Sequence, residues 1–427
     1  MRIWTHVLSF AAAICLMAGW PVLSQAGSFI GAAGNYGGVI DPGIGGDPAN
    51  SGLVQIQLKE TGSFSGAVIW QSQRYALKGR LDESGAFSKA FRKQATDTEA
   101  QITFSFSLST STLSISGELK DEPAGSSPLV VQFELTGAPP DSALAIQLQP
   151  GTRVSFIDPP DPSPEGDTVP AAASPLPAAA PAPIPGDGFS VVTVAKTASR
   201  AARLVGRLPD YDGAYSAGSP LRGGDYSVFS SLYKKKKAVG GQLFGKATVQ
   251  NNGDPTPQVQ SQLRWGKRQG FDPQFYADGI DKGVFLDAVP YPKVKRGNLV
   301  PILPGNSEPT RSINARMTFR RGNIKIQGPG GTEQSFKVNL AISPFRSKVV
   351  GENPYQVKLN VDAFSGRFRG TFMHPVLNVK TKFEGAFQAS ILIVPGIGRG
   401  NFRPPVKDSI VPLDEPLESG GVTVSVN

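Results

Sequence analysis

Apolar residues recur at every second position along much of this chain, and this alternation constrains the fold more than any other feature. A β-strand points successive side chains to opposite faces, so the pattern is typical of a strand with one buried face. It runs through residues 54–58, 102–108 and 131–135, and it returns through residues 313–319 and 336–342. The chain is therefore predicted to be all-β.

Turn-forming residues separate these stretches at the short intervals that are typical of antiparallel sandwiches and barrels. Such turns fall at Gly62, at residues 82–85 and at residues 121–125. We expect two antiparallel β-barrel-like or sandwich-like domains joined by a Pro/Ala-rich linker. The one helix candidate is the Ala- and Arg-containing stretch at residues 194–205.

The first 26 residues have the organisation of a secretory signal peptide. Arg2 precedes an apolar stretch at residues 7–20, and small residues lie before a cleavage point after Ala26. The apolar stretch is shorter than the ~20 residues that span a bilayer as a helix. We therefore predict an exported protein, located outside the cell, at the cell surface or in the periplasm, with no transmembrane helix.

A Pro- and Ala-rich stretch divides the remaining chain. Such a composition cannot bury a core and favours an extended polyproline conformation, which makes it a semi-rigid spacer. The predicted organisation is a signal peptide at 1–26, an acidic β domain at 27–157, the linker at 158–188 and a basic β domain at 189–427.

Cysteine and histidine counts limit the chemistry. Cys15 and His6 lie inside the predicted signal, so the mature chain has no cysteine and only His374. This excludes disulfide scaffolds, cysteine nucleophiles and multi-histidine metal sites. His374 lies in a Phe-Met-His-Pro turn without a nucleophile motif, so we predict no catalytic residue, no metal site and no cofactor.

The net charge of +9 conceals two opposite halves. Residues 27–190 hold 9 basic and 17 acidic side chains, a net charge of −8, whereas residues 191–427 hold 33 and 17, a net charge of +16. Clusters that mix cations with aromatic residues suit anionic polymers, because cations neutralise the charges and rings stack on sugars or bases. An exposed, merely solvated surface is the alternative interpretation. The predicted polyanion-binding residues are Lys234, Lys235, Lys236, Lys237, Arg264, Trp265, Lys267, Arg268, Lys293, Lys295, Arg296, Arg320 and Arg321.

For an exported chain we expect an anionic envelope or extracellular polysaccharide as the partner, and nucleic acid is the less favoured ligand. The charges also predict a contact between the acidic and the basic half.

A short motif occurs once in each half. Gly62-x-Phe64-x-Gly66 is followed by Lys78-Gly79, and Gly366-x-Phe368-x-Gly370 is followed by Glu384-Gly385. A glycine on a strand leaves a gap that an aromatic ring can cover. Each half also opens with a Tyr-x-Gly unit, at residues 36–38 and 211–213.

With these motifs, and with the later residues 232–233, 263–267, 398–402 and 419–422, the chain resembles a group of secreted β-rich proteins of Verrucomicrobia and related bacteria. The long Pro/Ala segment and the run of lysines at 234–237 depart from the group's pattern. The resemblance implies an exported all-β protein and implies no catalytic residue.

The sequence thus favours an exported, non-catalytic binding or structural module. Two alternatives remain open. A secreted carbohydrate-active enzyme needs only two carboxylates, and the sequence has many. An outer-membrane barrel is disfavoured because most alternating stretches are shorter than the 9–11 residues of a spanning strand.

Overall fold

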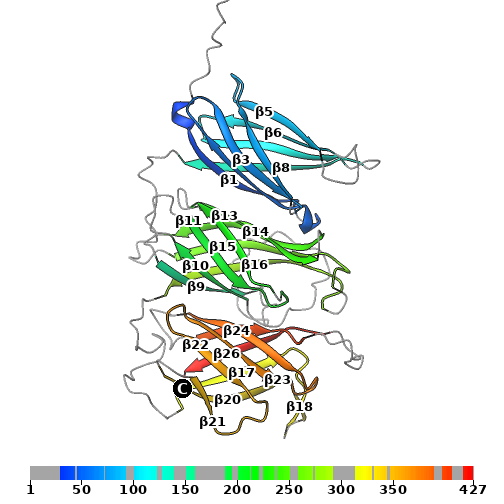
Figure 1. The fold of residues 1–427 in the computed structure, drawn as a ribbon, viewed down its shortest axis with the longest axis vertical. Coiled ribbons are helices and arrows are strands. Elements are labelled where there is room, and N and C mark those ends of the chain that lie inside the picture. The colour runs from blue at the N-terminus through cyan, green and yellow to red at the C-terminus, as the bar shows by residue number, and fades with distance from the viewer. Residues whose placement is uncertain are drawn as a thin grey trace, which may run out of the picture.

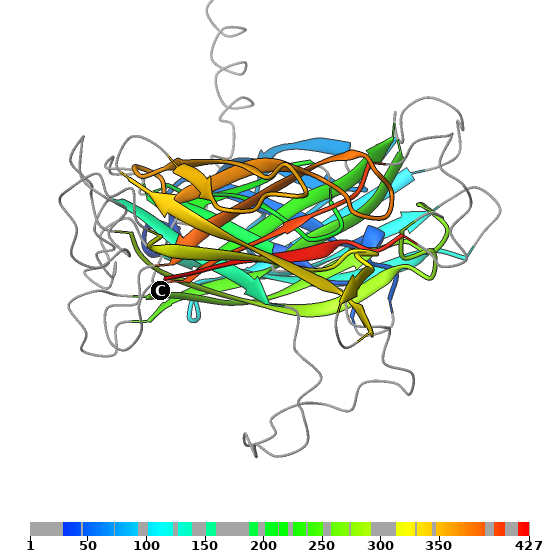
Figure 2. The ribbon, with the colours of Figure 1, turned by 90° about the horizontal axis from the view of Figure 1, so that it is seen from below.

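The computed structural model describes residues 29–43, 46–71, 73–92, 101–122, 127–138, 151–158, 188–194, 201–211, 213–220, 225–235, 238–250, 258–272, 275–291, 313–328, 331–343, 347–388, 397–405 and 417–426. Within this part of the chain the structure consists of β-strands and two short 3-10 turns, η1 (Ile30–Ala32) and η2 (Pro48–Asn50). Figure 1 shows three antiparallel sheets stacked along the longest axis of the molecule. Seen along that axis, the sheets lie over one another (Figure 2).

The first sheet has eight strands in the order β4-β3-β2-β1-β8-β7-β6-β5. Its strands are β1 (Gly34–Ile40), β2 (Gly52–Leu58), β3 (Ser63–Trp70), β4 (Gln73–Arg80), β5 (Ala86–Arg92), β6 (Gln101–Ser109), β7 (Ser114–Glu122) and β8 (Leu129–Ala138). The curled sheet brings its two ends together, since the Phe64 ring on β3 lies 4.7 Å from the Phe87 ring on β5. β4 and β5 are the two end strands of the hydrogen-bonded order, and aromatic packing closes the gap between them.

The second sheet repeats this arrangement in the order β12-β11-β10-β9-β16-β15-β14-β13. Its strands are β9 (Gly151–Asp158), β10 (Gly188–Val194), β11 (Ala201–Arg207), β12 (Tyr215–Pro220), β13 (Asp225–Lys235), β14 (Ala238–Gln250), β15 (Gln258–Lys267) and β16 (Ile280–Pro290). The long strands β13 to β16 form a continuous antiparallel meander.

The third sheet has the order β21-β20-β17-β26-β25-β24-β23-β22. Its strands are β17 (Ala315–Arg321), β20 (Ser335–Ile342), β21 (Ser347–Val350), β22 (Lys358–Asp362), β23 (Arg367–Met373), β24 (Lys380–Gln388), β25 (Ile397–Phe402) and β26 (Gly420–Val426). A separate two-stranded ribbon consists of β18 (Ile326–Gly328) and β19 (Gly331–Glu333).

The predicted all-β, antiparallel, barrel-like architecture is confirmed. The sheets, however, number three in the described chain, and the segment predicted as one C-terminal domain contains most of the second sheet and all of the third. The predicted linker also has a different role. Because residues 151–157 of β9 pair with β10, residues 159–187 connect two neighbouring strands of one sheet rather than two sheets.

The helix candidate at residues 194–205 was wrong. Its described residues are strand: Val194 ends β10, and residues 201–205 belong to β11, whose partners on both sides are strands. Tertiary pairing here overrides the helical propensity of Ala and Arg.

The repeated Gly-x-Phe-x-Gly motif has a clear packing role. Phe64 and Phe368 are buried inside the first and third sheets, and each lies directly across from a glycine on the next strand, Gly79 or Gly385. The ring thus covers the space that the glycine leaves, as the sequence predicts. Counted along the chain, the motif occupies the third strand of the first sheet (β3) but the fifth strand of the third sheet (β23). It is therefore a local packing device rather than a marker of equivalent strands.

Candidate functional site

Four residues predicted to bind a polyanion lie on β15 or immediately after it, and the structure places them in two kinds of surroundings. Trp265 is fully buried, and its indole N–H donates to the Tyr233 hydroxyl over 3.1 Å. Lys267 is also buried, with a side chain that is 0% exposed. Neither can reach a dissolved polymer, so these two predictions were wrong: both residues have the inward-facing parity of Leu263.

Lys267 instead lies in a buried charge cluster at the end of the second sheet. Its Nζ donates to Asp210 Oδ2 and to the Phe275 carbonyl oxygen, each over 2.6 Å. Asp272 lies 4.0 Å away. Burial raises the pKa of Asp210 to about 6, although the charges of Lys267 and Arg403 oppose the rise.

Arg403 brings the third sheet into this cluster. It follows β25, and its guanidinium lies 3.8 Å from the centre of the Phe275 ring. It forms an ion pair with Asp272 and donates to the Asp210 carbonyl oxygen over 3.2 Å. The cluster therefore joins the second sheet to the third and has a structural role.

Arg264 and Arg268 join the second sheet to the first. The Arg264 guanidinium binds Asp281 on β16 through two hydrogen bonds of 2.6 and 2.7 Å, and it also donates to the carbonyl oxygens of Gly43 and Gly46. Arg268 pairs with Asp47 at 3.0 Å. Acidic and basic halves of the chain thus contact each other here, which is the kind of contact that their charges predict.

The other predicted cations do not form one surface with these. Lys234 and Lys235 lie on β13, and the Lys234 side chain is exposed. Arg320 and Arg321 are exposed at the end of β17 in the third sheet. The remaining predicted residues, Lys236, Lys237, Lys293, Lys295 and Arg296, lie outside the described residues.

A different basic surface lies on the outer face of β22, β23 and β24, and we call it the basic face. Its exposed cations are Lys358, Arg369, Lys380 and Lys382. Strand register places them together: Lys358 and Lys382 flank Thr371 in one row, and Arg369 lies in the next row. Neighbouring strands are about 4.8 Å apart, so the α-carbons of Lys358 and Lys382 are separated by about 10 Å.

The basic face is hollowed and retains its positive charge. A depression of about 430 Å³ lies over it, lined in part by Asn360, Arg369 and Thr371. Among the described residues that line the depression, the one carboxylate is that of Glu384, which pairs with Arg207 of the second sheet at 3.1 Å and with Arg367 at 3.5 Å. None of the four exposed cations forms an ion pair with a carboxylate of the described chain. Residues 315–426 together hold 15 basic and 8 acidic side chains.

His374 is buried in the turn after β23 rather than available for chemistry. Its Nε2 lies 2.7 Å from the Gly322 carbonyl oxygen, and its Nδ1 accepts hydrogen bonds from the amides of Val376 and Leu377. Nδ1 is therefore the acceptor, and Nε2 carries the proton. Burial lowers the pKa of His374 and keeps the ring neutral.

Comparisons with known proteins add no functional assignment. No family model matches the chain, and no curated protein matches it. Among solved structures, the vaccine antigen transferrin-binding protein B from Haemophilus parasuis Hp5 matches with 12% identity and a TM-score of 0.20, over 92% of this chain and 76% of that chain. Intact Ap-TbpB, with its N and C lobes, matches with 11% identity and a TM-score of 0.19 over the same shares. A protein of unknown function from Nostoc punctiforme matches with 9% identity and a TM-score of 0.19, over 61% and 97%. Similarity at this level carries no argument about ligand or partner.

Within the described ranges, no helix has the length and apolar character needed to cross a bilayer.

Proposed function

We propose that this protein is an exported, non-catalytic β module that binds anionic polysaccharide on its basic face. The observation that carries the proposal is the group of four exposed cations, Lys358, Arg369, Lys380 and Lys382, on three adjacent strands around a depression. Rigid strands hold these charges at fixed spacing, so a polymer of carboxylate- or sulfate-bearing sugars can contact several at once.

The non-catalytic part of the proposal is supported by His374. It is the only histidine of the predicted mature chain, and both ring nitrogens take part in hydrogen bonds within the turn. The exported location is supported by the signal-like residues 1–26 and by the resemblance to secreted β-rich proteins.

The test uses the full mature chain on immobilised polygalacturonate, with immobilised neutral dextran for comparison. We expect retention at low salt on the anionic polymer only, with release as salt rises, because screening and ion competition weaken such contacts. A variant with Lys358→Gln, Arg369→Gln and Lys382→Gln should elute at a markedly lower salt concentration.

A matched control removes three exposed charges elsewhere, through Lys234→Gln, Arg320→Gln and Arg321→Gln. This control should elute close to the wild-type salt concentration. Equal losses in the two variants would show that net charge alone causes retention, and the basic face would then be rejected as the site. Failure of the wild-type chain to bind would reject the proposed function itself.

A further inference from the structure

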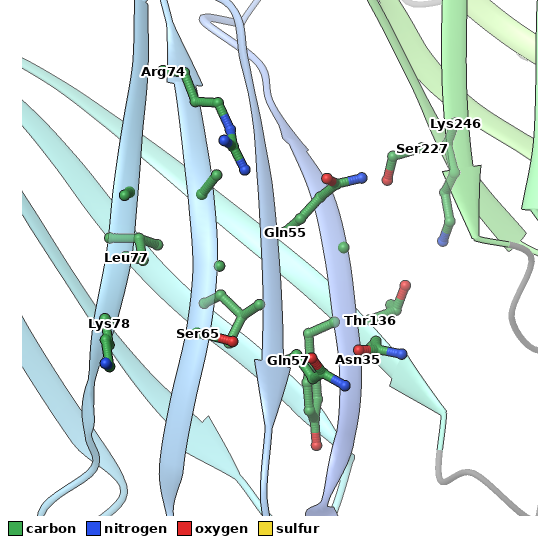
Figure 3. Close-up of a pocket in the computed structure, with 16 residues that line it drawn as sticks. Asn35, Gln55, Gln57, Ser65, Arg74, Leu77, Lys78, Thr136, Ser227 and Lys246 are labelled. Atoms are coloured by element: carbon green, nitrogen blue, oxygen red, sulfur yellow. The ribbon is translucent and has the colours of Figure 1, made fainter. Parts of the chain in front are cut away.

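A second hollow lies between the first and second sheets, and we call it the inter-sheet recess (Figure 3). Its volume is about 600 Å³. The floor is the outer face of β1 to β4, and the opposite wall contains Ser227 on β13 and Lys246 on β14. Ser227 and Lys246 are direct cross-strand partners, so they form a single edge facing the floor.

Strand register explains why the recess exists. On the outer face of the first sheet, Val39, Leu53 and Ile69 lie in one cross-strand row, and they pack against Phe229 and Phe244 of the second sheet. This apolar row is one of the places where the two sheets touch.

The next row on the same face has small side chains. It contains Gly37, Gln55, Ala67 and Ala76, which are neighbours across β1 to β4. With no Cβ at Gly37 and only methyl groups at the two alanines, the space beside the apolar contact is left unfilled. This row of the floor is flat, with a single amide, that of Gln55, projecting from it. A planar or chair-shaped ring can therefore lie against the strands.

The charged side chains around this floor are all positive. The side chains of Arg74, Lys78 and Lys246 supply three cations, and among the described residues no aspartate or glutamate lines the recess. This contrasts with the surrounding segment, since residues 27–190 are acidic overall. Figure 3 shows Gln55 and Asn35 on the floor side facing the wall that carries Ser227 and Lys246.

These groups match a particular ligand chemistry. Amide side chains both donate and accept hydrogen bonds, which suits sugar hydroxyls, and Gln55, Gln57 and Asn35 provide three of them. Cations at the border form charge-assisted hydrogen bonds with carboxylates. We propose that the inter-sheet recess binds a short oligosaccharide that carries carboxylate groups. The site is separate from the basic face and does not depend on the function proposed for it.

Because its two walls belong to different sheets, the recess has a further property. A ligand that contacts Gln55 on one side and Lys246 on the other binds only when the sheets hold their native arrangement. Binding therefore stabilises the junction between the first and second sheets, as any ligand stabilises the state that it selects.

The test is isothermal titration of the full mature chain with trigalacturonate. We expect the recess to account for one bound trisaccharide per chain, in addition to any trisaccharide held on the basic face. Ala76→Trp places a large side chain on the floor at an exposed strand position, so it should block the recess without disturbing the interior. It should weaken binding at least tenfold. Arg74→Gln combined with Lys78→Gln should weaken it by a similar factor.

The matched control is Arg80→Gln, which removes an exposed cation from the same strand but outside the recess. Its affinity should stay within twofold of the wild type. Absence of binding by the wild-type chain, or unchanged affinity in Ala76→Trp, would overturn the site assignment. Equal affinity for the methyl-esterified trisaccharide would overturn the role of carboxylates.

Retention of Ala76→Trp on polygalacturonate separates the two sites. We expect this variant to elute as the wild type does, because the basic face is intact. Parallel loss of both activities would contradict two independent sites.

Discussion

Replacement of Lys267 by methionine tests the buried charge cluster that joins the second sheet to the third. The side chains of Lys267 and Asp210 are both 0% exposed and lie 2.6 Å apart. Methionine retains the length and apolar stem of lysine, but it removes the charge and two hydrogen bonds, those to Asp210 and to the Phe275 carbonyl. Among the cations of the described residues, Asp210 would keep the more distant Arg403 guanidinium, at 3.7 Å.

Breaking a buried ion pair by removing one partner costs about 3–5 kcal/mol, because the other charge is left without compensation. With a slope of about 2 kcal/mol/M, this loss lowers the urea midpoint by about 1.5–2.5 M. Fluorescence of Trp265, in a Trp70→Phe background, reports the unfolding of the second sheet, since the Trp265 indole is buried beside the cluster.

The expected loss depends on pH. Above pH 6 Asp210 is ionised in the wild type and attracts Lys267, whereas below its pKa of about 6 the carboxyl takes up a proton. The loss from Lys267→Met should therefore be larger at pH 7.5 than at pH 5. Adding Asp210→Asn to the methionine variant should restore about 1–3 kcal/mol at pH 7.5, because the uncompensated charge is removed.

Lys246→Met is the matched control, since Lys246 is exposed on the neighbouring strand β14. We expect its unfolding free energy to change by less than about 0.5 kcal/mol. Unfolding of Lys267→Met and Lys246→Met at the same urea concentration would contradict a stabilising role for the buried pair.

Three further substitutions test other parts of the structure. Because the pKa of Asp210 is raised in the folded protein, the free energy of unfolding should fall by about 3 kcal/mol as pH rises from about 4 to about 6. Urea titrations across that range should show this fall in the wild type, and Asp210→Asn should abolish it. The lowered pKa of His374 acts in the opposite direction, with stability lost as pH falls below about 6.5, and His374→Gln should remove that loss from the unfolding curve of the third sheet. Arg264→Lys should speed amide hydrogen exchange in residues 46–51, because lysine cannot bind Asp281 through two hydrogen bonds while also reaching the carbonyls of Gly43 and Gly46. Exchange that stays at the wild-type rate would contradict a tethering role.

The alternation of apolar residues was sufficient to predict the strands. Ile102, Phe104, Phe106 and Leu108 are all buried on β6, as their period of two requires. The number of sheets could not be predicted in the same way, because a Pro/Ala-rich segment has one composition whether it separates domains or links neighbouring strands. Only the pairing of β9 with β10 distinguishes the two cases.

The candidate site shows a similar division. The parity of β15 places Lys267 on the same face as Leu263 and Trp265, so the sequence does contain the signal that Lys267 is inward-facing. The grouping of cations into clusters obscured that signal. By contrast, the basic face depends on the register between β22, β23 and β24, and the inter-sheet recess depends on β14 approaching strands that lie far earlier in the chain. A single sequence supplies neither.

The charge asymmetry of the chain also acquires a more specific meaning. Residues 27–190 have a net charge of −8, and five of their acidic residues lie in the segment 158–188, which holds no basic residue. At both junctions between sheets, cations are compensated by carboxylates: Arg268 pairs with Asp47, and Arg403 pairs with Asp272. These cations cannot bind a ligand without losing the ion pairs that hold neighbouring sheets together. The basic face is different, because its four cations pair with no described carboxylate, so occupying them costs no contact between sheets. A ligand there should leave the stability of both junctions unchanged, whereas a ligand in the inter-sheet recess should raise the stability of the first junction.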